Sequence, residues 1–347
     1  MFNSFNISLN YLLIKYYSLD EIIKNNTMKN LFKFKCIAIL AFISIVGASC
    51  NNDDKMSTPA DNTITGVATK TSNLSILVQA LVKADLAATL QGTGPFTVFA
   101  PTDAAFTAFL SANSYATIND VPKEALTQIL LNHVVSGSVK SNTLTTGYIK
   151  TLAKGSASSN PLSMFVNTGS SMVKLNGIAM VTTPDIIASN GVIHIVDKVI
   201  GLPTIVMHAT ANPSFSTLVA ALTYNPASGF AGILSGTASS PFTVFAPTND
   251  AFTAFLTETG YSGLAAIPAN VLEKTLKYHV VAGANVQSSQ LTNDQVVPTF
   301  SGQKVTVKFT PTRLLDVSNR NCNIIAVDVQ CSNGIIHVLD KVLLPTF

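Results

Sequence analysis

An internal repeat with a period close to 146 residues constrains the fold of this chain more than any other feature. The segment PFTVFAPTDAAFTAFL at residues 95–110 recurs as PFTVFAPTNDAFTAFL at residues 241–256, and NHVVSG at 132–137 recurs as YHVVAG at 278–283. A third block, SNGVIHIVDKVI at 189–200, recurs as SNGIIHVLDKVL at 332–343. A repeat of this length can enclose its own hydrophobic core, so each copy is a domain and not one turn of a solenoid. We expect domains at residues 63–202 and 203–347.

Each copy places helical patterns before strand patterns. Apolar residues recur at the spacing of one helix face, with Ser72 or Asn73 as the N-cap. The run FTVFA is β-branched and aromatic and predicts a buried strand that ends at a proline. Asn190-Gly191 and Asn333-Gly334, each between apolar runs, are typical of type I′ hairpins. Helices followed by strands predict an α+β fold. The apolar positions of the first helix are Leu74, Leu77, Val78 and Leu81, and those of its copy are Phe215, Leu218, Val219 and Leu222.

The three blocks in this order resemble the fasciclin-like domain, and both units match it over essentially their whole length. The resemblance implies two tandem domains, each a β-sandwich wedge with packed helices. It also implies a non-enzymatic protein of adhesion or matrix binding, whose partners are extracellular or surface proteins or glycans. The alternative from another functional class is a carbohydrate- or small-ligand-binding protein of the cell envelope.

The amino-terminal region reads as an export signal. From Met28 three lysines precede a short apolar run, and small residues follow before Cys50. The ending resembles a bacterial lipobox, which implies cleavage after residue 49 and lipidation of Cys50. Alternatives are a short membrane anchor or an ordinary cleaved signal. Residues 1–27 precede the charged region and favour Met28 as the true start.

The residues after Cys50 indicate where the protein is held. Residues 50–62 are polar and are typical of a flexible tether. The acidic pair Asp53-Asp54 resembles the surface-export signal of lipoproteins in Bacteroidota-type bacteria. We therefore expect a lipid-anchored protein of the cell envelope, in the outer membrane and exposed at the surface.

Charge and motif content argue against nucleic-acid binding and catalysis. Charged residues make up 11% of the chain and the net charge is +3, so there is no basic stripe for a phosphate backbone. His194 and Asp197 lie three residues apart on a strand, as do His337 and Asp340, so each pair points to opposite faces. The five histidines lack the spacing of a metal site, and no cofactor motif is present.

The resemblance also marks residues where a partner could bind. The second unit keeps the family's Tyr-His motif as Tyr278-His279, whereas the first has Asn132-His133. Asp185-Ile186 resembles the short Asp-Ile motif that animal members present to integrins, and Asp328 is its weaker counterpart. The residues themselves favour structural roles, because both histidines of the Tyr-His motif lie on an apolar helix face near its C-terminus.

The remaining singled-out residues are expected to be structural. Thr102 and Thr248 should cap short helices, and a further three polar residues fall in the first turns of those helices. Cys322 and Cys331 are candidates for a disulfide bond if the chain bends between them, because a straight strand would separate them by roughly 30 Å. The alternative is two buried thiols. The first-turn residues are Asp103, Asn249 and Asp250, and the other structural residues are His133, His194 and His337.

Overall fold

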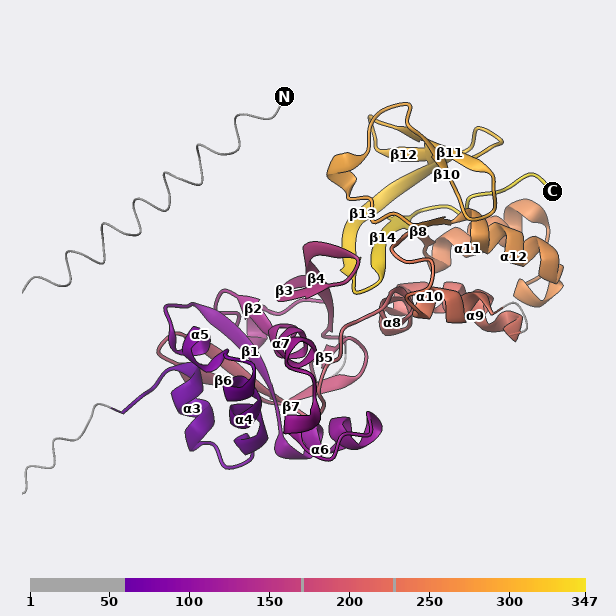
Figure 1. The fold of residues 1–347 in the computed structure, drawn as a ribbon. Coiled ribbons are helices and arrows are strands. Elements are labelled where there is room, and N and C mark those ends of the chain that lie inside the picture. The colour runs from indigo at the N-terminus through magenta and orange to yellow at the C-terminus, as the bar shows by residue number, and fades with distance from the viewer. Residues whose placement is uncertain (1–59, 170–171, 227–228) are drawn as a thin grey trace, which may run out of the picture. The chain divides into compact units, whose positions relative to one another are not determined.

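The computed structural model describes residues 60–347 except 170–171 and 227–228, and within this part each repeat forms helices packed on a seven-stranded sheet (Figure 1). The α+β class predicted from the sequence is therefore confirmed. The signal region, Cys50 and most of the tether lie outside the described residues. None of the described helices is long and apolar enough to span a bilayer.

The first repeat begins at α3, whose N-cap is Thr63. Its helices are α3 (Ile64–Lys70), α4 (Ser75–Lys83), α5 (Ala87–Gln91), α6 (Asp103–Ala112) and α7 (Lys123–Leu131). Its strands are β1 (Phe96–Pro101), β2 (Val134–Ser136), β3 (Gly147–Gly155), β4 (Ser158–Asn167), β5 (Lys174–Leu175), β6 (Ala179–Ala188) and β7 (Gly191–Val196).

The second repeat begins in the same way at α8, whose N-cap is Thr204. Its helices are α8 (Ile205–Ala211), α9 (Ser216–Tyr224), α10 (Phe230–Ser235), α11 (Asn249–Thr259) and α12 (Ala269–Tyr278). Its strands are β8 (Phe242–Pro247), β9 (Val280–Ala282), β10 (Val296–Pro298), β11 (Lys304–Lys308), β12 (Arg313–Leu315), β13 (Asn321–Cys331) and β14 (Gly334–Leu339).

Both sheets have the same topology. The strand order is β2-β1-β7-β6-β5-β4-β3 in the first repeat and β9-β8-β14-β13-β12-β11-β10 in the second. The central pairs β1–β7 and β8–β14 are parallel, and all other described pairs are antiparallel. In the first repeat the two outer strands β2 and β3 contact each other, so the sheet curls into a wedge.

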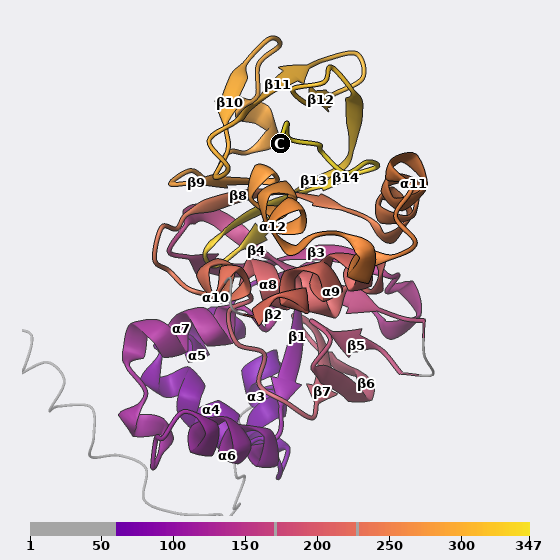
Figure 2. The same cartoon turned by 90° about the vertical axis from the view of Figure 1, so that its right-hand side faces the viewer.

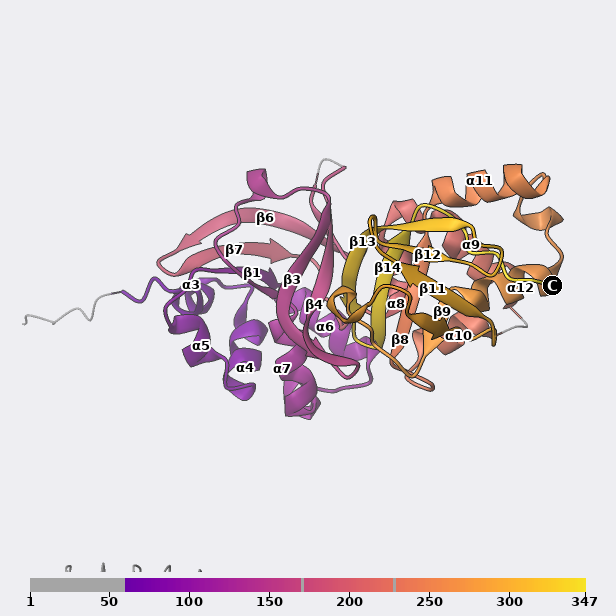
Figure 3. The same cartoon turned by 90° about the horizontal axis from the view of Figure 1, so that it is seen from above.

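The curled sheet has a core on each of its two faces. On β1, Val98 and Ala100 pack against the helices, whereas Phe99 points into the interior of the curl beside β4 and β5. This alternation explains why FTVFA is apolar throughout. Figure 3 shows α3, α4 and α7 along one side of β1 and β7, and Figure 2 shows α8, α9 and α10 on the side of β8 and β14 away from β10–β12.

The predicted hairpins form, but their turns are not type I′. The turn of the first hairpin consists of Ser189 and Asn190, because Ala188 pairs with Gly191, and neither turn residue has a positive φ. Gly191 is needed for another reason. A Cβ there would lie 2.0 Å from the carbonyl oxygen of Phe96 on the neighbouring parallel strand.

The side chain of Asn190 makes hydrogen bonds that the hairpin pattern does not indicate. Its side-chain oxygen accepts a hydrogen bond from the N–H of Ile64 at the start of α3 (2.9 Å), and its amide donates to Leu90 O and Gly92 O. Asn333 makes the equivalent bonds in the second repeat, to the N–H of Ile205 and to two carbonyl groups at the C-terminal end of α10, those of Leu234 and Gly236. Each asparagine therefore ties its hairpin to two helices.

The two candidate cysteines do not form a disulfide bond. Cys322 and Cys331 are free thiols at opposite ends of the same strand, β13. Cys322 lies in the core inside the second curled sheet, whereas Cys331 lies in the core beneath the helices. Burial raises the pKa of the Cys322 thiol to about 12 and also raises that of Cys331. Of the two predicted alternatives, the structure therefore has the buried thiols.

Candidate interaction sites

Asp185 lies at an irregularity in β6, where its φ of 61° breaks the register with β7. Its carboxylate accepts hydrogen bonds from the N–H of Ser141 (2.8 Å) and from the Ser141 hydroxyl. These two bonds hold the pKa of Asp185 below its ordinary value. The side chain nevertheless stays 35% exposed. Asp185 thus fastens the loop before β3 to the sheet while one part of its surface faces solvent.

The histidine beside Asp185 is buried, as is the histidine beside its counterpart Asp328 in the second repeat. Asp185 N–H donates to His194 Nδ1 (3.2 Å), and His194 Nε2 lies 2.9 Å from the carbonyl oxygen of Val139. The second repeat has the same arrangement at Asp328, which accepts from Ser288, and at His337. Both imidazoles are fully buried and brace the irregular strand.

The residues of the Tyr-His motif are also internal. His279 is 3% exposed; its Nδ1 donates to Thr275 O and its Nε2 accepts from the N–H of Leu343. Tyr278 is fully buried, with its hydroxyl donating to the carbonyl oxygen of Lys304. A direct partner contact at Tyr278 or His279, which the resemblance implied, is not compatible with this burial.

The first repeat uses different chemistry for the same purpose. His133 keeps both ring contacts, to Ile129 O and to the N–H of Ile200. Asn132, which replaces the tyrosine, donates to Gly201 O (2.9 Å) and accepts from the Thr151 hydroxyl. Burial lowers the pKa of His133 and of its counterpart His279 to about 4.

The helix-start residues divide into two kinds of cap. Thr102 and Thr248 cap their own helices, α6 and α11. Asp103 instead caps α4, because its carboxylate accepts from the N–H of Ile76 (2.7 Å) and from the Ser75 hydroxyl. Asn249 caps α9 in the same way, through Thr217 N–H, and Asp250 is exposed. The expected cap of α4 at Ser72 or Asn73 is wrong, since the residue there is Leu74 and the capping side chain comes from α6.

Ile187, which sequence reasoning did not single out, is the most exposed of residues 185–187. Ile186 packs partly against the helical core, whereas the side chain of Ile187 is 62% exposed. The signal was available, because adjacent residues on a strand point to opposite faces and both cannot be buried on the same side.

The β3–β4 hairpin contacts the second repeat along β13. Ala157 N–H donates to Ser332 O (3.1 Å), and Ser163 Oγ accepts from the N–H of Gln330 (3.0 Å). Gly155 permits the close approach, because a Cβ there would lie 2.5 Å from the Cα of Ser332.

Two larger side chains extend this contact. Lys150 Nζ donates to the carbonyl oxygen of Asp328 (2.7 Å), and burial lowers its pKa. Tyr148 packs against the helical core of the second repeat, with its ring 5.4 Å from that of His208 and its hydroxyl accepting from Asn212. The two repeats are therefore joined by specific side chains and not by the linker alone.

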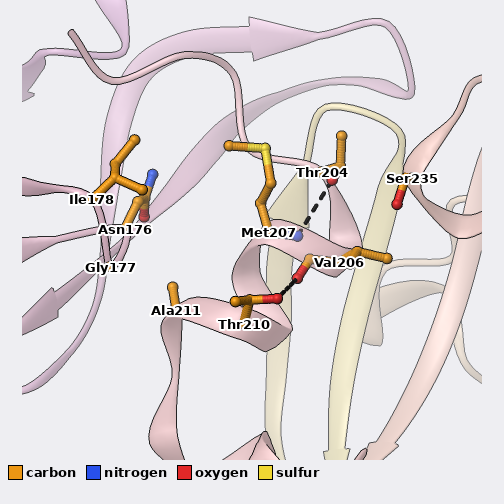
Figure 4. A pocket seen from close by; sticks show the side chains of 9 residues that line it. All are labelled: Asn176, Gly177, Ile178, Thr204, Val206, Met207, Thr210, Ala211 and Ser235. Atoms are coloured by element: carbon orange, nitrogen blue, oxygen red, sulfur yellow. Dashed lines mark hydrogen bonds between the residues drawn. The ribbon is translucent and has the colours of Figure 1, made fainter. Parts of the chain in front are cut away.

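A cavity of about 340 Å³ lies beside this contact (Figure 4). Asn176, Gly177 and Ile178 line one side, and α8 lines the other with Met207 and Thr210. The hydroxyl of Thr210 is already bonded to Val206 O within the helix. Within the described residues, no group of three or more His, Cys, Asp or Glu could hold a metal ion.

Comparison with known proteins gives one family for both repeats. The model of the fasciclin domain matches residues 72–203 and 213–345. Protein sll1483 of Synechocystis is 42% identical over 142 residues, which cover 41% of this chain and 73% of that protein.

Two further matches span both repeats. The transforming growth factor-beta-induced protein ig-h3 of Sus scrofa is 29% identical over 274 residues, which cover 74% of this chain and 35% of that protein. This chain therefore spans about a third of that relative. A FAS1 domain pair from the insect cell adhesion molecule Fasciclin I is 20% identical, with a TM-score of 0.47, and covers 77% of this chain and 95% of that chain.

Proposed function

Because the chain belongs to the fasciclin domain family, we propose that it is a non-enzymatic adhesion or matrix-binding protein of the cell envelope. Its two domains bind extracellular or surface proteins or glycans by their surfaces. The observation that carries this proposal is that every histidine of the chain is buried. General acid–base catalysis requires a side chain that reaches the substrate proton, and these imidazoles bond or pack inside the fold.

The two cysteines of the domains support the same conclusion. A nucleophilic cysteine needs a lowered pKa and an accessible thiolate. Cys322 and Cys331 have the opposite properties, since both are fully buried and burial raises both pKa values. The exposed groups at residues 185–187 are a carboxylate and an isoleucine, which suit recognition and not bond cleavage.

We further propose that the protein is anchored by a lipid on Cys50 and displayed on the outer face of the outer membrane. Residues 50–62 would hold the domains away from the membrane, and Asp185 with Ile186 would belong to the partner-facing surface of the first domain. Asp328 is a weaker candidate, because the main chain at that residue already accepts a hydrogen bond from Lys150.

A carbohydrate- or small-ligand-binding function is the second candidate, and the cavity beside α8 favours it. Its volume of about 340 Å³ lies within the range of small-molecule sites. Asn176 lines it with a buried side-chain amide nitrogen that has no hydrogen-bond partner. A ligand of this kind would have to be mainly apolar, because Thr204 and Thr210 direct their hydroxyls into α8 itself.

Protease treatment of intact cells that express the full chain tests the proposed display. We expect loss of the protein from the treated cells, and release of the Cys50→Ser variant from the membrane fraction. A protein that resists protease until the envelope is opened would place the domains inside and contradict the proposal. Pull-down of surface proteins and binding of small apolar ligands then separate the two functions, since saturable binding of such a ligand that Met207→Trp abolishes would favour the ligand-binding alternative.

A further inference from the structure

Two surfaces form the contact between the repeats, one from each repeat. Each of these surfaces has a structural equivalent on the other repeat. The first repeat contributes the outer face of β3 and β4, and the second contributes α8 and the edge of β13. Because both sheets have the same strand order, β6 is the counterpart of β13, and β10 and β11 are the counterparts of β3 and β4.

The β3–β4 hairpin covers the edge of β13, whereas the equivalent edge of β6 in the first repeat is exposed. Among the described residues, the main chain of β6 is bonded on this side only as far as Val181, so the rest of β6 is a sheet edge, as is the same part of β13. Ile187 and Gln330 are equivalent, since each precedes the residue that pairs with the hairpin glycine. Gln330 is 1% exposed, since its main-chain N–H bonds Ser163 of the first repeat and its side chain bonds Asn285 and Gln287 of its own repeat, whereas Ile187 is 62% exposed.

The second repeat covers the outer face of β3, whereas the equivalent outer face of β10 is exposed. Tyr148 precedes the core residue Ile149 on β3, and Val296 precedes the core residue Val297 on β10. Tyr148 packs against the second repeat. Val296, in the equivalent place, is 55% exposed.

The geometry points to head-to-tail association of this chain with further copies of itself, the β10–β11 face of one copy seated on the β6 edge of the next. Exposed strand edges with apolar side chains are surfaces that natural proteins otherwise protect. The contact would repeat, between two copies, the interface that the two repeats of one chain already form with each other. Because the contact joins two different surfaces, a pair of copies leaves one β6 edge and one β10–β11 face free. Further copies can bind there, and the assembly grows as an open row.

This contact is smaller than the internal one. The β3–β4 hairpin extends to Gly155, which lies against Ser332, whereas β10 ends at Pro298 and β11 begins at Lys304. The position of Lys150, which donates to Asp328 O, is taken by Pro298. We therefore expect reversible association that depends on concentration, which suits domains held close together on a membrane.

The internal contact also predicts which side chains meet between copies. The main-chain N–H of Gln330 bonds Ser163 Oγ, and Ser163 pairs with Lys150 on the neighbouring strand. The equivalent of Ser163 is Lys304, which pairs with Pro298. The main chain at Ile187 of one copy should therefore lie beside Lys304 of the next. Ile187→Lys would bring two ammonium groups together.

Sedimentation velocity of the full chain in detergent, over a concentration series, tests the inference. We expect the average mass of the wild type to rise with concentration. Ile187→Lys should weaken association at least about tenfold, which is 1.4 kcal/mol, and Ile187→Lys combined with Lys304→Glu should restore it. Val82→Lys is the matched control, because Val82 is also 62% exposed but lies on α4 and not on β6, β10 or β11.

A mixture of two variants tests the direction of the contact. Ile187→Lys keeps the β10–β11 face and Val296→Glu keeps the β6 edge, so an equimolar mixture should form dimers that do not grow further. A wild type that stays monomeric at every concentration would overturn the inference. So would equal weakening by Val82→Lys, or failure of Lys304→Glu to restore association. Circular dichroism of each variant separates these outcomes from unfolding.

Discussion

Buried neutral histidines make each domain sensitive to acid at the scale of single residues. His133 and His279 each sit at the end of a helix with both ring nitrogens bonded. Their Nε2 atoms accept hydrogen bonds from main-chain N–H groups, so the fold requires the neutral imidazole. Protonation would turn an acceptor into a donor and leave a buried charge.

We predict that the free energy of unfolding is greatest above pH 6.5 and falls as the pH drops toward 4. The unfolded chain binds protons on these histidines near pH 6.5, whereas the folded chain binds them only near pH 4, so acid favours the unfolded state. The loss is bounded by roughly 3 kcal/mol for each histidine. Urea unfolding at several pH values measures it.

His279→Gln is the variant that assigns this effect. It should lower stability at pH 7.5, because the bonds to Thr275 and Leu343 are weakened, but its stability should depend less on pH between 6.5 and 4. An unchanged pH slope in His279→Gln would show that other groups cause the acid sensitivity.

Gly191 shows why a residue can be recognised in the sequence for the wrong reason. Asn-Gly between apolar runs predicts a hairpin, and the hairpin forms. The glycine is needed because β7 approaches β1, and the asparagine is needed because its side chain bonds α3 and the end of α5. Both requirements come from segments about 100 residues away, which a local pattern does not contain.

We predict that Gly191→Ala lowers the free energy of unfolding of the first domain by about 3 kcal/mol or more. The new methyl group would meet the main chain of Phe96, which cannot move without breaking the central pair of strands. Gly201→Ala is the control, since a Cβ at Gly201 has no heavy atom within 4 Å. Equal urea midpoints for the two variants would refute this role of Gly191.

At the scale of elements, the helices are capped across the fold as well as within themselves. Thr102 and Thr248 follow the local rule and could be recognised from the residue type before each helix. Asp103 and Asn249 lie one residue further on, yet they cap α4 and α9, whose capped N–H groups lie 27 and 32 residues earlier in the chain. Local reasoning identified the polar residues but not the helices that they serve.

We predict that Asp103→Ala lowers the free energy of unfolding by about 1 kcal/mol, as loss of an N-cap generally does. Asp103→Asn should retain most of the stability, because Asn249 performs the same task in the second domain. Asp250→Ala, at an exposed position of α11, should change the urea midpoint little. A larger loss in Asp103→Asn than in Asp103→Ala would contradict the capping role.

At the scale of the whole molecule, the repeat predicted two similar domains, and the family match and the strand orders agree with it. The contact between the domains could not be predicted from the repeat, because it uses residues in which the copies differ. Tyr148 and Ser163 lie on the outer face of an edge hairpin, where the pattern of apolar residues predicts solvent. Only the position of α8 and β13 turns that face into an interface.

Tyr148 should therefore stabilise a domain to which it does not belong. We predict that Tyr148→Ala lowers the stability of the second domain by about 2 kcal/mol, because the ring packs against that domain's helical core. Hydrogen exchange should increase in α8 and the end of β13, while exchange in α4 stays unchanged. Tyr115→Ala is the control, since Tyr115 packs against the first domain's own core and should affect that domain instead. If Tyr148→Ala left α8 as protected as in the wild type, the domains would be joined by the linker and not by this contact.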